Sequence, residues 1–445
     1  MGTGAAGFVR RLAFEDLPDA IVERGKLLLL DTIGVAVAGA GTEPAAIARR
    51  AAALLFPAGP RDAGGQARAL FRGGALSPAG AAFAGATAID SVDAHDGHQP
   101  SKGHAGVALL PGLLALAETG PACDGREFLT CYLLGYELAH RAAVALHTTV
   151  GDYHTSGAWN ALAVAALGAR RFGLPEAGIR EALGIAEYWG PRSQMMRVID
   201  QPSMLKDGSG WGALVGVTAA VMAREGFTGA PAVTVEAEAV APLWQDLGSR
   251  WLIPDVYVKA YPVCFWAQGP VTAVMELRRE HGLRGDEIAA IRVETFHAAT
   301  RLAERRPATS DHAQYSLPFP AAAAAVHGRL GLEQIDGPGL ADPAVLKLAA
   351  GMELVERFEF EAAFPQRRLC EVELTLTDGR KLRSGPTEPK GHQGAPLGQA
   401  EIEAKFEILA GALPEPRREA IREAVLALEE QGDLAPFLDL LLEPA

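Results

Sequence analysis

Cysteine is scarce in this sequence of 445 residues. Its four cysteines are Cys123, Cys131, Cys264 and Cys370, and no two of them show CxxC spacing. So few thiols do not build the disulfide framework of a small secreted protein, and their spacing matches no zinc or redox motif. We therefore expect free thiols in a reducing compartment, which makes the cytoplasm the predicted location.

Basic residues are also in short supply. Lysine and arginine together number 41 against 54 aspartates and glutamates, which gives a formal net charge of -13 at pH 7. Proteins that bind nucleic acid or anionic membranes need a basic surface to meet the phosphates. We therefore predict no nucleic-acid partner and no membrane partner.

Long apolar runs and nucleotide-binding motifs are missing. The most apolar windows are residues 27–40, which Asp31 interrupts, and residues 211–222. Both fall short of the roughly 20 apolar residues that a membrane span needs. Neither a GxxxxGK[ST] phosphate loop nor a GxGxxG after a strand is present, so nothing indicates a nucleotide or nicotinamide cofactor.

Helical patterning dominates from about residue 17 to residue 280. Alanine, leucine and glycine recur there at helical spacing, with Pro, Gly or Asp between the segments. Four windows are too densely apolar for surface helices, namely residues 27–40, 107–116, 159–167 and 211–222. This part of the chain is predicted to be a bundle of buried helices.

After about residue 280 the period changes. Residues 288–296 and 370–377 alternate apolar and polar side chains, which is typical of strands. Asp378-Gly379 followed by residues 381–383 predicts a hairpin turn and a returning strand. Helices are predicted at 319–330 and 342–354 between the strands, and at 399–409 and 416–431 in the tail. The fold class is therefore mainly α, with a separate α+β domain from about 270 to 390.

The densest polar cluster lies between two apolar segments, residues 81–89 and the run that begins at Val107. It contains Asp90, Asp93, His95, Asp96, His98, Lys102 and His104. Gly97 and Pro100 break the helical pattern, so we expect a loop held between two buried helices. Such loops often carry catalytic residues, and three imidazoles are unusual in an ordinary loop.

Three interpretations of this cluster remain open. Asp93, His95, Asp96 and His98 could ligate a divalent metal as in a metal-dependent hydrolase, although the spacing matches no tight motif such as HExxH. The same residues could act without metal as general acids and bases beside a lysine. The cluster could also be a solvated polar loop that only caps two helices.

Two further stretches predict anion-binding helix starts. Thr155, Ser156 and Gly157 precede an apolar helix, where free backbone N–H groups would hold a carboxylate beside His154. The alternative is that this segment only caps the helix. Lys206 stands before the small residues at the start of the next apolar helix, which is again an anion-binding arrangement.

A last stretch, residues 259–268, places Lys259 before an aromatic, proline-bearing loop that ends near Gln268. Taken alone, it indicates a core-packing junction between two elements. We interpret Cys264 within it as a small hydrophobic residue.

These stretches, in this order, resemble the MmgE/PrpD family along nearly the whole chain. The resemblance is carried by Leu30-Asp31-Thr32-Ile33-Gly34, by the loop from Asp93 to His104 with Leu110-Pro111-Gly112 after it, by Leu134-Gly135-Tyr136-Glu137 with Arg141, by His154-Thr155-Ser156-Gly157, by Gly173-Leu174, by Ala182 to Ala186, by Ala223 to Gly229, by Lys259 with Tyr261-Pro262 and Cys264, and by Ser316-Leu317-Pro318. Each piece is weak alone, and the ordered set is strong.

The resemblance implies a large helical domain formed by both chain ends, residues 1–268 and 392–445, and a smaller α+β lid, residues 269–391. It also implies a homodimer without metal or cofactor that moves a proton at carbon in a small anionic polycarboxylate. The implied catalytic residues are Asp93, His104, His154 and Lys206. From the resemblance together with the stretches described above, we expect substrate-binding roles for His95, His98, Lys102, Thr155, Ser156, Lys259 and Gln268.

Three positions depart from the family pattern. The loop after Asp93 has Gly97 where a threonine is common, and it is about one residue longer. Gln268 stands where many members carry a histidine, and Phe319 where several carry a tyrosine. Neither side chain can donate a catalytic proton, so His95, His98 and Lys102 are candidates to replace the missing acid.

The leading functional interpretation is a cofactor-independent, dehydratase-like lyase of the 2-methylcitrate dehydratase type. An epimerase or isomerase of a dicarboxylate, similar to iminodisuccinate epimerase, is the close alternative. A metal-dependent hydrolase and a non-catalytic carboxylate-binding protein are the alternatives from other classes.

Overall fold

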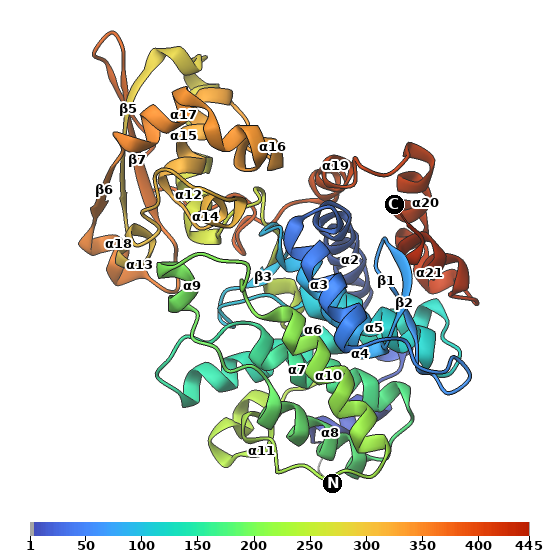
Figure 1. Ribbon diagram of the computed structural model, residues 1–445. Coiled ribbons are helices and arrows are strands. Elements are labelled where there is room, and N and C mark those ends of the chain that lie inside the picture. Colours follow the sequence, from blue (N-terminus) through green and yellow to red (C-terminus); the bar gives the residue numbers. More distant parts are fainter. Residues whose placement is uncertain (1–3, 445) are drawn as a thin grey trace. The chain divides into compact units, whose positions relative to one another are not determined.

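The computed structural model describes residues 4–444 and is mainly α-helical with small sheets (Figure 1), which confirms the predicted fold class. The chain divides into two compact units. The first comprises the described residues of 1–195, 206–256 and 398–445, and the second comprises 196–205 and 257–397. Within the described part of the chain, no helix is both long and apolar enough to cross a membrane.

The first unit is almost entirely helical. Its α-helices are α1 (Ala5–Arg11), α2 (Asp19–Ala40), α3 (Glu43–Leu55), α4 (Pro78–Asp90), α5 (Gly106–Thr119), α6 (Gly125–Thr149), α7 (Gly157–Arg171), α8 (Glu176–Trp189), α10 (Ser209–Arg224), α11 (Val233–Glu236), α19 (Gln399–Leu409), α20 (Glu415–Leu426) and α21 (Ala435–Leu442). Short strands β1 (Ala67–Ala69) and β2 (Gly73–Leu76) pair antiparallel, and β3 (Gly97–His98) lies in the polar loop. β4 (Val256–Tyr257) spans the sequence boundary between the units.

The four densely apolar windows form buried helices, as predicted. They lie within α2, α5, α7 and α10, whose middle turns are buried on almost every side. Trp211 is the exception, because it lies in the first turn of α10 and is 51% exposed. α10 packs against α7 and α4, and α4 packs against α5. Hydrogen bonds join the start of α10 to the start of α7 and to the C-terminal end of α4 inside the first unit.

The second unit combines a four-stranded sheet with helices. Its elements are α9 (Met196–Asp200), α12 (Phe265–His281), β5 (Ile288–Thr295), α13 (His297–Thr300), α14 (Ser310–Gln314), α15 (Pro318–His327), α16 (Leu332–Ile335), α17 (Pro343–Ala350), β6 (Glu353–Glu356), α18 (Phe358–Ala363), β7 (Cys370–Leu376) and β8 (Lys381–Arg383). The strand order is β6-β5-β7-β8, with β6 parallel to β5 and the other pairs antiparallel. α12 packs against β7, and α15 packs against α12 and α17 (Figure 1).

The alternating segments form the predicted strands and hairpin. Burial along β7 alternates at every residue, so one face is buried and the other partly exposed. Gly379 in the turn to β8 has φ of 88°, which a glycine adopts without strain.

The predicted helix over residues 342–354 is wrong at its C-terminal end. α17 stops at Ala350, and residues 353–356 form β6, which extends the sheet by pairing with β5. The predicted tail helices correspond to α19 and α20, while α21 follows without a prediction.

Candidate active site

The loop between α4 and α5 is buried, although it is rich in charged residues. The exposed fraction is 3% for Asp93, 0% for His95 and Asp96, 1% for His98 and 8% for His104. The interpretation as a solvated capping loop is therefore wrong. The loop folds back on itself through a hydrogen bond from the His98 amide to the Gly103 carbonyl at 2.9 Å, which returns the chain toward His95.

Three groups contact His104: the carbonyl of Asp96, the hydroxyl of Ser156 and the carboxylate of Asp207. Its Nδ1 contacts the backbone carbonyl of Asp96, and its backbone N–H donates to the hydroxyl of Ser156 at 3.0 Å. Because a carbonyl only accepts, Nδ1 carries the proton in the neutral ring. The Nε2 atom then has a lone pair and lies 3.7 Å from Oδ2 of Asp207.

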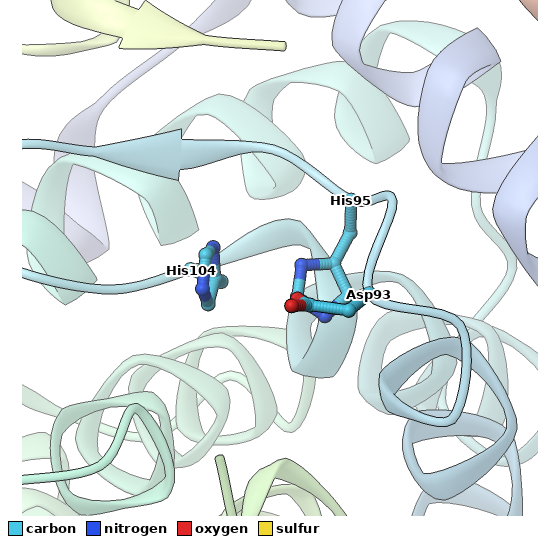
Figure 2. A group of neighbouring side chains, drawn as sticks. All are labelled: Asp93, His95 and His104. Atoms are coloured by element: carbon cyan, nitrogen blue, oxygen red, sulfur yellow. The ribbon is translucent and has the colours of Figure 1, made fainter. Parts of the chain in front are cut away.

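His95 lies beside His104 in the same buried region. The centroids of the two rings are 4.4 Å apart, and Nε2 of His95 lies 3.3 Å from Oδ1 of Asp90. One ligand-type atom from each of Asp93, His95 and His104 lies within 4.8 Å of the others. Figure 2 shows the Asp93 carboxylate and the His95 ring together, facing the His104 ring. The loop therefore gathers three of the predicted site residues.

The starts of α7 and α10 each hold an aspartate of the protein itself. The carboxylate of Asp207 accepts hydrogen bonds from the amide of Ser156 at 3.1 Å and from its hydroxyl at 2.8 Å. The amide of Ser209 donates to Oδ2 of Asp90 at 3.2 Å. These helix starts favour anions, but Asp207 and Asp90 take the amides of Ser156 and Ser209, so these two amides do not bind an external carboxylate as predicted.

Burial raises the pKa of both of these aspartates. The pKa of Asp90 rises to about 6, because its carboxyl is removed from water and Asp93 lies nearby. Hydrogen bonds from Ser209 and the charge of Lys206 oppose that shift. Burial likewise raises the pKa of Asp207, against the attraction of His104. Carboxyl groups with raised pKa values can hold or release a proton near neutral pH.

Asp207 is a further candidate site residue, and the sequence did not predict it. It follows Lys206 directly, and its link to His104 depends on α7 and α10 beginning side by side. The sequence does contain one signal for Asp207, its position at the start of an apolar helix. From the sequence, we attribute the chemistry of that position to Lys206 alone.

Lys206 is buried and has a strained backbone. Its exposed fraction is 2%, and its φ of 47° is unusual for a residue with a side chain. Lys102 shares this feature with a φ of 56°, and its ammonium group lies 5.7 Å from the ring centroid of Tyr153. Such strained residues concentrate at functional sites, so this geometry supports the prediction for both lysines.

His154 and Thr155 provide buried polar atoms next to these groups. Among residues 4–444, Nδ1 of His154 and the hydroxyl of Thr155 have no hydrogen-bond partner. The backbone N–H of His154 donates to Nε2 of His147 at 3.2 Å. An unpartnered polar atom in a buried position costs free energy unless a ligand or water satisfies it. Ser156, by contrast, uses its hydroxyl and amide within the protein.

His98 lies in a separate group with Ser101 and His140. The hydroxyl of Ser101 lies 2.6 Å from Nδ1 of His98 and 3.1 Å from Nδ1 of His140. Burial lowers the pKa of His98 to about 3, with a smaller effect from Arg250. His98 therefore stays neutral near pH 7 and does not supply the missing acid that we considered for it.

Lys259 and Gln268 lie in the second unit and are buried, with exposed fractions of 1% and 0%. The amide of Gln268 donates to the carbonyls of Tyr261 and Val263, and its oxygen accepts from the amides of Ala260 and Tyr261. This uses the whole hydrogen-bonding capacity of the Gln268 amide. The geometry thus favours a role for Gln268 in shaping the loop after Lys259, while its predicted contact with substrate stays a prediction.

One further residue reaches the loop from the C-terminal end of the chain. Nζ of Lys405, on α19, lies 2.6 Å from Oδ1 of Asp31 on α2 and donates to the carbonyl of Ala94 at 2.6 Å. Ala94 lies between Asp93 and His95, so this ion pair holds the part of the loop that carries these two residues.

Known protein families cover most of the chain. The MmgE/PrpD N-terminal domain matches residues 4–242, and the MmgE/PrpD C-terminal domain matches residues 261–430.

Three named relatives illustrate the similarity. Cis-aconitate decarboxylase of Aspergillus terreus (strain NIH 2624 / FGSC A1156) is 26% identical, over 97% of this chain and 93% of the relative. Cis-aconitate decarboxylase of Homo sapiens is 25% identical, over 96% of this chain and 92% of the relative. The mitochondrial 2-methylcitrate dehydratase of Yarrowia lipolytica (strain CLIB 122 / E 150) is 30% identical, over 41% of this chain and 37% of the relative.

Proposed function

We propose, from the premise that this chain belongs to the MmgE/PrpD family, that it is a lyase that removes water or carbon dioxide from a small tricarboxylate by acid–base catalysis without a cofactor. The relatives are named as a decarboxylase and a dehydratase, both lyases, which supports the reaction class. The observation that carries the proposal is the buried His104–Asp207 pair, with Lys206 next to Asp207 in the chain.

His104 is the proposed base. Its protonated Nδ1 is directed to a carbonyl, which leaves Nε2 to accept a proton from the carbon next to a substrate carboxylate. The imidazolium that forms is stabilised by the carboxylate of Asp207, 3.7 Å away. In dehydration the C–H electron pair becomes the double bond, and the hydroxyl leaves as water after taking a proton from an acid.

The same groups serve a decarboxylation. The bond between carbon and the departing carboxylate breaks, carbon dioxide leaves, and the electron pair stays on carbon until an acid protonates it. Lys206 is the proposed cation that holds the substrate and the developing negative charge. His154 and Thr155 are proposed as polar contacts to the substrate, because their buried atoms have no partner among residues 4–444.

An epimerase is the second candidate, and it needs two proton carriers on opposite faces of one carbon. His95 and His104 do not suit this role, because their ring centroids are 4.4 Å apart and leave no room for a carbon between them. An epimerase would therefore require His154 opposite His104.

Proton NMR in D₂O of the purified protein with di- and tricarboxylates tests the proposal. New vinylic signals or release of carbon dioxide identify a lyase. Deuterium that enters a C–H position without loss of the compound identifies an epimerase and contradicts the lyase. Saturable binding without turnover would indicate a carboxylate-binding protein.

Variants connect this activity to the site. We expect His154→Ala and Lys206→Ala to lower turnover at least about a hundredfold while circular dichroism stays that of the parent protein. His281→Ala is the matched control, because this histidine is exposed on the second unit and should retain turnover. Full activity in both site variants would contradict the assignment.

A further inference from the structure

We propose that Asp93, His95 and His104 form a binding site for a divalent transition-metal ion of the Zn²⁺ and Co²⁺ class. Each residue offers one ligand atom, these atoms lie within 4.8 Å of one another, and all three residues are buried. Figure 2 shows the three side chains directed to a common region. The interpretation of the sequence had grouped Asp93 and His95 with Asp96 and His98 instead, and the fold replaces those two with His104.

In both histidines one ring nitrogen contacts an oxygen of the protein, as is usual for histidines that bind a metal. A metal-binding histidine gives its second ring nitrogen to a carboxylate or a backbone carbonyl, which fixes the ring and its tautomer. Here Nε2 of His95 lies 3.3 Å from the Asp90 carboxylate, and Nδ1 of His104 contacts the Asp96 carbonyl. The lone pairs are thereby assigned to Nδ1 of His95 and Nε2 of His104, the nitrogens that can turn to an ion.

The set of donor atoms fits the ion class. Two imidazole nitrogens and one carboxylate oxygen, with a remaining position for water, form an open zinc site. Ligand atoms around tetrahedral zinc lie roughly 3.4 Å apart, given Zn–N distances of about 2.0–2.1 Å. The ligand atoms must therefore approach one another by up to about 1.4 Å when an ion binds. Oδ2 of Asp207, 3.7 Å from Nε2 of His104, supplies further negative charge.

The consequence for activity rests on the proposed function. Asp93 and His104 cannot carry a proton while they bind an ion, so occupancy would inhibit the lyase, and a chelator would restore turnover. In a metal-dependent hydrolase, by contrast, the ion would be required for turnover and a chelator would abolish it.

Titration with Co²⁺ alone, without substrate, tests the site. The protein is first treated with a chelator and dialysed. We expect visible absorption bands of bound Co²⁺ that saturate at one ion per chain and disappear when Zn²⁺ is added. His95→Phe should bind at least about tenfold more weakly. His95→Asn serves if the larger side chain prevents folding, and His147→Gln, a histidine outside the group, should bind like the parent.

Absence of stoichiometric Co²⁺ binding to the parent, or parent-like affinity in both His95 variants, would overturn the site. An anomalous-scattering map of crystals soaked in ZnCl₂ locates the ion directly, and an ion bound elsewhere would also overturn it. Because no substrate is present, a failed metal site leaves the proposed lyase standing. Metal binding by a protein that turns over no tricarboxylate would refute the lyase alone.

Discussion

Burial determines what each histidine of the first unit can do. It lowers the pKa of His98 to about 3 and that of His147 to about 4, with smaller contributions from nearby cations. The sequence predicts that imidazoles gather in the loop, because three of them fall within residues 95–104. It cannot predict their protonation, since this depends on which ring nitrogens contact carbonyls or hydroxyls from other helices.

Acid should destabilise the protein through these histidines. The unfolded chain binds a proton at each of them as the pH falls through about 6.5, whereas folded His98 stays neutral until about pH 3. Stability is therefore fully present above pH 6.5 and falls below it, by about 2 kcal/mol from His98 alone between pH 6.5 and pH 5. Urea unfolding across this range measures the effect.

His98→Gln isolates this contribution. Glutamine still reaches the hydroxyl of Ser101 and does not titrate, so the variant should lose less stability than the parent as the pH falls. Parallel stability profiles for parent and variant would show that His98 is not responsible.

The starts of α7 and α10 show how elements create a site that neither contains alone. A Cβ placed on Gly157 would lie 2.4 Å from the carbonyl oxygen of Gly208, and one on Gly212 would lie 2.7 Å from that of Gly157. This contact allows Asp207 to reach the start of α7. Apolar periodicity predicts both helices correctly, but it does not say that their first turns meet. For this reason the sequence predicts an anion site at each start but not the internal carboxylates that bind the Ser156 and Ser209 amides.

Gly157→Ala should separate these helix starts. Overpacking at a backbone contact usually costs about 1–3 kcal/mol, and the Asp207–Ser156 hydrogen bonds should weaken with it, so turnover should fall as well. Denaturant unfolding measures the loss of stability. Gly151→Ala is the control, because nothing lies within 4 Å of its added Cβ and stability should change by less than about 0.5 kcal/mol. Equal stability of the two variants would contradict the close contact.

At the scale of the whole chain, residues from both ends build the first unit. The resemblance to a known family, rather than periodicity, predicts that the C-terminal helices join the N-terminal ones. The ion pair of Lys405 and Asp31 could not be predicted from the sequence. The pattern around Asp31 indicates only a break in an apolar helix, and that around Lys405 indicates only a polar helix face. Only the packing of α19 on α2 brings their charges together.

Lys405→Met should destabilise the protein by about 3–5 kcal/mol, because it leaves the Asp31 carboxylate buried without its cation. Adding Asp31→Leu removes the second charge and should recover most of this stability. Turnover should stay low in the double variant, because the Ala94 carbonyl still lacks its donor. Denaturant unfolding and steady-state kinetics separate the two effects. Full recovery of turnover would contradict a positioning role for Lys405.

The hydrogen bond from Lys405 to Ala94 can form only late in the synthesis of the chain. Lys405 follows Ala94 by 311 positions. The loop with Asp93 and His95 is therefore synthesised long before Lys405, whose ammonium group holds it. A nascent chain can form the early helices as they emerge. The loop, however, lacks its hydrogen bond from Lys405 until α19 has been synthesised. The loop can therefore reach the conformation described above only after α19 has been synthesised.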